Sequence, residues 1–205
     1  MSTAADWRDI DEHIDPDTLK VPENPEHRRV VDAIGIVASR ELRPHTVVYR
    51  DMNWYPPDGG NAVAPDLMTL PVGALASGAK SYKQLPGMPF PGVVIEVPSD
   101  TDTFNGMRAK AARYRSLGVD LYVISADSGV GAALRFSASS ADPVTWTGLP
   151  IESLGGLTVE VVDTEVMIRT SDGVLISADV DLVRGFESDR ILELEAKLRA
   201  LGVEP

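Results

Sequence analysis

Residues 91–122 constrain the fold more than any other segment, because they combine three elements in close succession. An apolar run over 92–97 lies between two prolines, which is typical of a central strand covered on both faces. A helical pattern over 107–117, stopped by Gly118, and a second strand over 120–125 follow it. This order predicts a right-handed parallel crossover, and therefore an α/β fold.

Glu96 is the anomaly inside the first of these strands. An unpaired buried carboxylate either changes its pKa or needs a cation. Asp66 follows Pro65 near the start of an earlier strand and supplies a second acid. Magnesium prefers hard oxygen ligands and keeps several waters, so these two carboxylates and the backbone carbonyl of Val97 would suffice as protein ligands. The sequence therefore predicts a site for Mg²⁺ or Mn²⁺.

Lys110 is the candidate amine of this site. It lies on the helix that leaves the Glu96 strand, and a crossover helix packs back over its own sheet, so its long side chain is expected to reach the strand end. There it would orient a water and stabilise charge on phosphate oxygens. Two acids and an amine are the minimum set for metal-assisted cleavage of a phosphodiester.

Each of these residues also has a purely structural interpretation. An Asp after Pro at a strand start is often turn chemistry, Glu96 could pair with an arginine, and Lys110 could be a surface lysine. Tyr114, one turn beyond Lys110, could contact substrate, although an aromatic there is more often core. The site is favoured only because order and spacing agree.

Net charge bears on the partners of the chain. A value of −12 argues against broad affinity for nucleic acid. The charge is uneven, however, because segment 104–118 contains no acid and four basic residues: Arg108, Lys110, Arg113 and Arg115. This segment would either contact a phosphate backbone or form a solvated helix face.

The remaining pattern predicts one domain with additions. Residues 1–23 look like an arm, and a helix is expected between Asn24 and Pro44. A hairpin should follow, and then a long functional or mobile loop over 71–90. Beyond Ser128, short strands indicate an antiparallel extension or a small second sheet. The hairpin is expected over 45–55 and 63–70. The strands beyond Ser128 are expected over 132–136, 144–147, 157–162, 166–170 and 174–176.

The last segment, 188–205, is expected to be a separate C-terminal helix. Four apolar residues recur there at spacings of three, four and three: Ile191, Leu194, Leu198 and Leu201. Two heptads are too few to form a coiled coil alone. The stripe would either dock on the body of the chain or form the seam of a homodimer.

Several classes of protein are not expected. The chain has no cysteine, so disulfides and thiolate metal sites are excluded, and a cytoplasmic location fits best. It has no run of eighteen apolar residues, so no membrane span is expected. The acidic N-terminal segment lacks the basic and apolar regions of a signal peptide.

The order of Pro-Asp, an apolar strand with Glu, and a lysine resembles the PD-(D/E)XK nuclease superfamily. More narrowly, it resembles the bacterial Uma family, whose members are described as restriction endonucleases. The residues that carry the resemblance are Ala64–Leu67, Ser81–Gln84, Val93–Val97, Ser99, Lys110, Tyr114, Gly118, Val119 and Tyr122. The likeness covers most of the chain from about Asn24, strongly over 63–126 and loosely over 130–188.

This resemblance implies a mixed central sheet flanked by helices over 24–187, with magnesium at Asp66 and Glu96 and DNA as substrate. The superfamily usually has its lysine two residues after the second acid, where this chain has Pro98, so the resemblance assigns the amine to Lys110. It adds Ser99 and His27 as substrate-binding candidates to those of the basic helix, which are Arg108, Arg113, Tyr114 and Arg115. One alternative is a nuclease-fold module for binding or dimerisation, with weak or lost catalysis. Another is a structural or partner-binding protein that uses its C-terminal helix as a dimer seam.

Overall fold

The computed structural model describes most of the chain from Pro25 to Val203. The described ranges are 25–42, 44–76, 78–98, 102–124, 133–136, 144–145, 157–162 and 165–203. The expected arm over 1–23, the Asn24 cap and Ser99 lie outside them.

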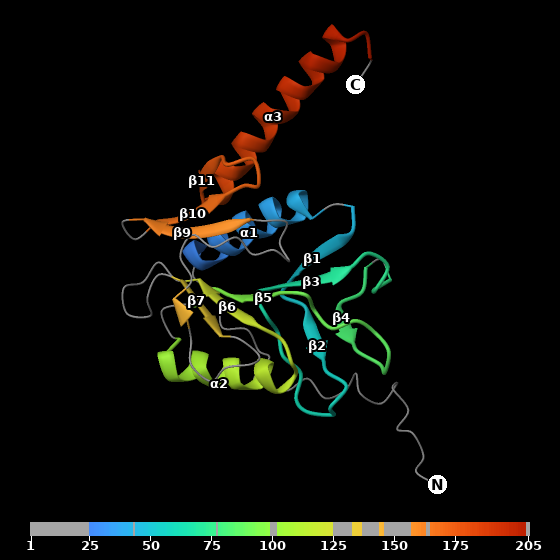
Figure 1. The fold of residues 1–205 in the computed structure, drawn as a ribbon, viewed down its shortest axis with the longest axis vertical. Coiled ribbons are helices and arrows are strands. Elements are labelled where there is room, and N and C mark those ends of the chain that lie inside the picture. The colour runs from blue at the N-terminus through green and yellow to red at the C-terminus, as the bar shows by residue number, and fades with distance from the viewer. Residues whose placement is uncertain are drawn as a thin grey trace.

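A six-stranded mixed sheet forms the centre of the fold (Figure 1). Its strands, in spatial order, are β1 (Thr46–Arg50), β3 (Leu67–Pro71), β5 (Val94–Glu96), β6 (Leu121–Ile124), β7 (Ala133–Phe136) and β8 (Val144–Thr145). β5 and β6 are parallel, and the other neighbours are antiparallel. The expected mixed sheet is therefore confirmed, with the Glu96 strand near its middle.

The crossover between the two parallel strands is α2 (Phe104–Ser116). The helix begins before the expected residue 107 because Thr103 caps it, its side chain accepting a hydrogen bond from the N–H of Gly106 at 3.1 Å. It ends where Gly118 adopts a φ of 75°, in the left-handed region that favours glycine.

The two faces of the sheet carry separate cores. On one face lie α1 (Pro25–Glu41) and a three-stranded sheet, and on the other lies α2 (Figure 1). The smaller sheet contains β9 (Thr158–Val162), β10 (Glu165–Arg169) and β11 (Leu175–Ser177). Both alternatives for the strands beyond Ser128 thus occur, because β7 and β8 extend the central sheet while β9 to β11 form a second one.

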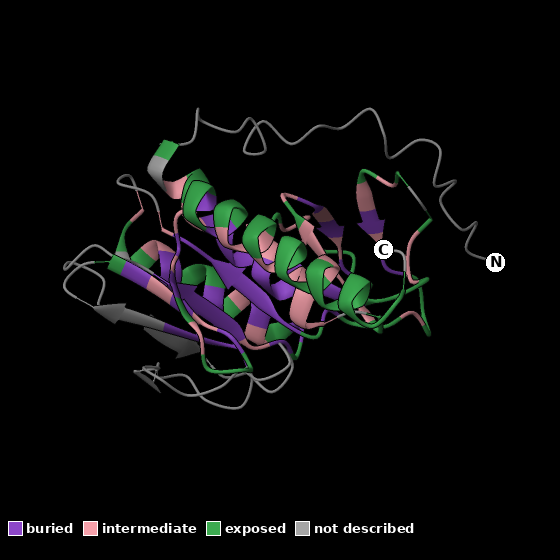
Figure 2. Ribbon diagram, turned by 90° about the horizontal axis from the view of Figure 1, so that it is seen from above, coloured by how far each residue is buried: buried purple, intermediate pink, exposed green. Residues whose placement is uncertain are grey.

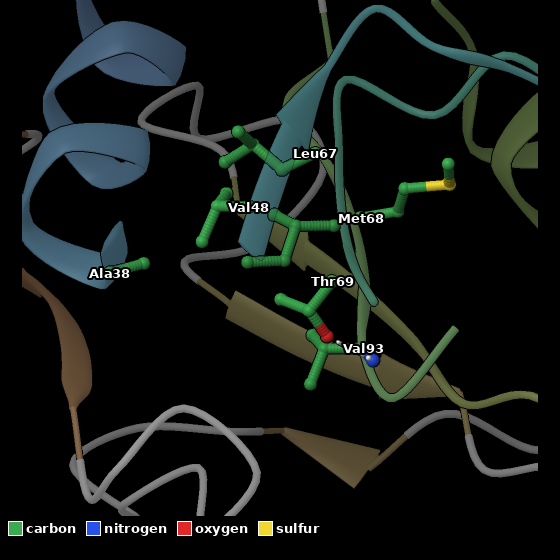
Figure 3. A pocket seen from close by; sticks show the side chains of 7 residues that line it. Ala38, Val48, Leu67, Met68, Thr69 and Val93 are labelled. Atoms are coloured by element: carbon green, nitrogen blue, oxygen red, sulfur yellow. Dashed lines mark hydrogen bonds between the residues drawn. The ribbon is translucent and has the colours of Figure 1, made fainter. Parts of the chain in front are cut away.

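Strand alternation distributes side chains between these cores. Ile95 packs in the α1 core with Ile34, whereas Val94 packs in the α2 core with Met107. Figure 3 shows a small apolar space between α1 and the sheet, lined by Ala38, Val48, Leu67, Met68, Thr69, Val93 and Ile95. The space is too small to admit a water molecule and belongs to the core.

The expectation of a long loop over 71–90 is partly wrong. Ser81–Lys83 forms β4, which pairs in parallel with β2 (Asn53–Tyr55). The pairing is backed by the buried side chain of Gln84, whose Oε1 accepts a hydrogen bond from Trp54 Nε1 at 3.0 Å. A polar-looking stretch is therefore part of the fold's second small sheet.

The last helix, α3 (Val180–Ala200), begins earlier than residue 188 because Asp179 caps it. Val180 and Val183 are buried against the body, but the helix then projects away from it (Figure 1). Docking of the apolar stripe on the body is therefore wrong, since Ile191, Leu194, Leu198 and Leu201 are all exposed. Among the described residues, no helix combines the length and apolar character needed to cross a membrane.

Candidate active site

Asp66 and Glu96 come from neighbouring antiparallel strands. Asp66 directly precedes β3, and Glu96 is the last residue of β5, with Leu67 and Ile95 as register partners. The N–H of Val97 donates to Asp66 Oδ2 at 2.7 Å. The first acid is therefore held beside the residue that follows the second.

Glu96 is buried and receives two donors from one helix. Its side chain is only 4% exposed. Lys110 Nζ donates to Oε2 at 2.9 Å, and the hydroxyl of Tyr114 donates to Oε1 at 3.0 Å. Lys110 thus reaches the strand end as the crossover predicts, because positions four apart on α2 share one side of the helix.

The environment of Glu96 disfavours its charge. Burial, and then the nearby negative charge of Asp66, raise the pKa of the Glu96 carboxyl to about 7, although Lys110 and Tyr114 act in the opposite direction. The Lys110 side chain is 44% exposed, so water screens part of the attraction between its positive charge and the Glu96 carboxylate. A buried carboxylate beside a second acid, with an incomplete counter-charge, is an environment that a cation would stabilise.

The amine and the phenol respond to the same acid. Burial lowers the pKa of Lys110, but the charge and hydrogen bond of Glu96, together with Asp102 and Asp66, outweigh it, so the pKa is raised. Burial, and then Glu96, raise the pKa of Tyr114 well above its usual value. Lys110 therefore remains a cation and Tyr114 a neutral donor at neutral pH. Asp102 is a neighbour of the amine that sequence reasoning missed, although its position just before the helix cap was a usable signal.

Tyr114 has a role that the sequence did not reveal. Its ring is buried and stacks on Trp54, with centroids 6.4 Å apart and planes at 17°. Phe90 meets Trp54 edge-on at 6.2 Å, and Gln84 binds the indole N–H. Tyr114 is thus both core and site, because its ring is fixed by packing while its hydroxyl holds Glu96.

His27 approaches Asp66 from α1. It is in the first turn of α1, its side chain is 8% exposed, and its Nε2 is 3.4 Å from Asp66 Oδ2. The structure therefore brings His27 to the site through the first acid. α1 and α2 cover different faces of the sheet, and each contributes side chains to the candidate site: His27 from α1, and Lys110 and Tyr114 from α2.

The arginines on α2 do not gather around Lys110. Arg113 forms an ion pair with Asp58 and donates to the carbonyl of Asn61 at 3.2 Å, so it ties the turn after β2 to the helix. Burial is slight there, and the hydrogen bond from Arg113 lowers the pKa of Asp58 to about 2. Arg108 and Arg115, seven residues apart, share a different side of α2 from Lys110. Their expected contacts with DNA stay predictions.

The oxygen donors at this site suit a hard cation that takes only a few of its ligands from the protein. Within the described ranges, no group of three or more His, Cys, Asp and Glu side chains is arranged to hold a metal. Two carboxylates and a backbone carbonyl are nevertheless enough for Mg²⁺, because it usually retains several waters. Asp66 directly precedes β3, Glu96 ends the adjacent β5 and Val97 follows it, so the oxygen donors fit the expected ion by their chemistry.

Comparison with known proteins adds independent findings. The model of the Uma2 family, described as "Putative restriction endonuclease", matches residues 11–130. A crystal structure from Anabaena variabilis of a "putative nuclease belonging to DUF820" is similar to the fold with a TM-score of 0.55 and 11% identity, covering 71% of this chain and 82% of that one. No curated protein matches the chain. The structural likeness confirms the expected α/β architecture.

Proposed function

The chain belongs to the Uma2 family, and from that membership we propose that it is an endonuclease that hydrolyses DNA phosphodiester bonds with Mg²⁺ or Mn²⁺. The observation that carries the proposal is the contact of 2.9 Å between Lys110 Nζ and Glu96, beside an Asp66 held by the N–H of Val97. Two acids and an amine from three separate elements converge at one end of the sheet. Such a group costs stability in a core, which favours a chemical role for it.

In this proposal each residue has a distinct task. Asp66, Glu96 and the carbonyl of Val97 would hold the cation, which when bound polarises the scissile phosphate and lowers the pKa of an adjacent water. Lys110 would orient the attacking water and stabilise negative charge on the phosphate oxygens. Tyr114 keeps Glu96 in place through its hydroxyl, and His27 restrains Asp66.

Substrate contacts complete the proposal. Arg108 and Arg115 would meet the phosphate backbone from α2, and Ser99 would do so from the segment between β5 and that helix. Arg113 would join them by exchanging its Asp58 partner for a phosphate, which offers the same bidentate geometry. The proposed substrate is DNA, consistent with this set of cations on one helix.

A second candidate function has its own support. Lys110 and Tyr114 occupy both oxygens of Glu96, and the net charge of −12 opposes tight DNA binding. We infer from these observations a competing function, in which the nuclease fold serves binding and its chemistry is weak or lost.

Nicking of supercoiled plasmid separates the two functions. The proposed endonuclease converts plasmid to the open-circular form with Mg²⁺ or Mn²⁺ and not with chelator. Lys110→Met and Glu96→Gln should each reduce the rate at least about a hundredfold. Lys197→Met is the matched control, because Lys197 is an exposed lysine that pairs with Glu193 on α3.

Wild-type nicking at the level of Glu96→Gln would contradict the endonuclease. If metal still binds in that case, the binding module becomes the better account. Nicking that is abolished by Lys197→Met as strongly as by Lys110→Met would remove Lys110 from its proposed task.

A further inference from the structure

α3 consists of an anchored base and a free-standing end. Val180 and Val183 are buried in the body, while Arg29 Nη2 lies 2.7 Å from Asp179 and Arg190 Nη1 donates to Asp172 at 2.8 Å. The C-terminal part of α3 extends away from the rest of the described fold (Figure 1). The anchors therefore fix the direction in which the last turns point.

The projecting end carries an apolar stripe at coiled-coil spacing. The exposed fractions of its members are 54% for Ile191, 50% for Leu194, 38% for Leu198 and 78% for Leu201. With Ile191 and Leu198 at a positions, Leu194 and Leu201 take d positions. Figure 2 shows this part of α3 coloured mainly as exposed. Four large apolar side chains in a row on a projecting helix mark an interaction surface.

We propose that this stripe is the seam of a homodimer in which two α3 helices pair in parallel. A second copy fits because an a/d stripe is self-complementary and a two-fold axis can place it against itself. The pairs Glu193–Lys197 and Glu195–Arg199 lie beside the stripe and leave it open. This inference rests on α3 alone and does not depend on the proposed chemistry.

Charge on the flanks of the stripe selects the parallel arrangement. In an antiparallel pair with all four apolar layers matched, Glu195 would face its own copy on one flank, and Lys197 would face its own copy on the other. Like charges so placed are destabilising. In the parallel pair Arg190 at g instead lies beside Glu195 of the second copy, and these opposite charges attract each other in addition to their pairs with Asp172 and Arg199 within one chain. Isoleucine at the first a position and leucine at both d positions also favour two parallel strands, while the second a position is Leu198.

The parallel pair has a consequence for the whole assembly. Both anchored bases lie at the same end of the seam, so the two bodies are held on the same side. Two heptads give modest affinity, and the dimer is expected to dissociate on dilution.

Sedimentation of the full-length chain tests the seam. Wild type should show a concentration-dependent dimer, and Leu194→Asp with Leu198→Asp should abolish it. Ala196→Asp with Ala200→Asp is the matched control, because both alanines are exposed on α3 but lie off the stripe. All four substitutions fall on exposed positions, so the fold should survive, as circular dichroism can verify. A wild type that stays monomeric at every concentration, or a dimer that survives the leucine changes, overturns the proposal.

Disulfide trapping tests the orientation cleanly, since the chain has no cysteine of its own. In a parallel pair Leu194 faces itself, so Leu194→Cys should form a covalent dimer on mild oxidation, whereas Ala196→Cys should not. In an antiparallel pair Leu194 would face Leu198. Crosslinking that appears only when Leu194→Cys and Leu198→Cys chains are mixed would therefore contradict the parallel arrangement.

Discussion

The hydrogen-bond partners of Glu96 only partly compensate for the burial of its carboxyl group. Its two oxygens are satisfied by Lys110 and Tyr114, yet its pKa is still raised because burial outweighs them. Removing either donor would leave the carboxyl with a larger desolvation cost. The residue is therefore sensitive to changes in its partners, and this sensitivity can be measured apart from any activity.

Lys110→Met should destabilise the protein by about 1–3 kcal/mol, because it leaves a buried carboxyl without its cation; the partial exposure of Lys110 keeps the loss below that of a fully buried pair. Urea unfolding measures this loss. The double variant Lys110→Met with Glu96→Gln should recover part of the stability, since the stranded charge is gone. A double variant as unstable as the sum of both single changes would contradict the coupling.

Tyr114→Phe should be milder. The change keeps the stacking on Trp54 and removes only the hydroxyl that donates to Glu96, so a loss of about 1 kcal/mol is expected in thermal or urea unfolding. Tyr55→Phe serves as a comparison on a less buried tyrosine. Equal losses in the two variants would mean that the Tyr114 hydroxyl makes no special contribution.

The raised pKa of Glu96 also gives a stability profile with a definite sign. Between the ordinary value of 4.5 and about 7, the folded protein holds a proton on Glu96 that the unfolded chain has released. The stabilisation is thus complete below the lower value and is lost as pH rises through the upper one.

In metal-free buffer, the free energy of unfolding of wild type relative to Glu96→Gln should fall by on the order of 1–3 kcal/mol across this window. Urea titrations at several pH values provide the measurement. Parallel pH profiles for the two proteins would show that Glu96 titrates normally. Added Mg²⁺ should flatten the wild-type profile, because a cation stabilises the charged carboxylate.

At the scale of elements, α2 depends on how its ends are closed. Gly118 ends the helix with a φ of 75°, and a Cβ there would meet nothing within 4 Å. Replacing it with a larger residue would therefore be opposed only by the strain of placing an L residue in the left-handed backbone region. Gly185 in α3 has the same open space without a positive φ. Gly118→Ala should therefore cost about 1 kcal/mol, whereas Gly185→Ala should be neutral or gain up to about 1 kcal/mol. Changes of the same sign in thermal unfolding would contradict this account of the cap.

Elements with a strong local pattern could be predicted from the sequence, and those defined by distant partners could not. The helix after Asn24, β5, α2 and β6 follow from periodicity and from their prolines and glycines. β4 was missed because its parallel partner β2 is remote in the chain, and because Gln84 looks like a loop residue until Trp54 is placed beside it.

The candidate site was predictable for a related reason. Asp66, Glu96 and Lys110 stand out as polar groups at fixed points of a strong pattern, whereas the Tyr114 hydroxyl and Asp102 gain their roles only from the packing of α2 on the sheet. The sequence pattern did not predict that α3 begins at Val180. The start is set by the single capping residue Asp179, which follows directly on the weak strand pattern of β11.

At the scale of the whole molecule, net charge limits how tightly the proposed DNA substrate could be bound. With a net charge of −12, binding would depend on a few local cations and should weaken steeply with salt. Each phosphate contact contributes about 0.9 to the salt slope, so Arg108→Ala with Arg115→Ala should lower the slope by about two units. Fluorescence anisotropy in Ca²⁺, with Arg199→Ala as a control on α3, measures the slope. An unchanged slope would remove these arginines from the interface.

Calorimetric titration with Mg²⁺ and Mn²⁺ would show whether Asp66 and Glu96 form the proposed divalent-metal site. We expect one ion per chain, proton release below about pH 7 as Glu96 loses its proton, and loss of binding in both Asp66→Asn and Glu96→Gln. Asp58→Asn, which changes an acid paired with Arg113 instead, should bind like wild type. No binding to wild type, or binding that survives Glu96→Gln, would contradict the proposed site.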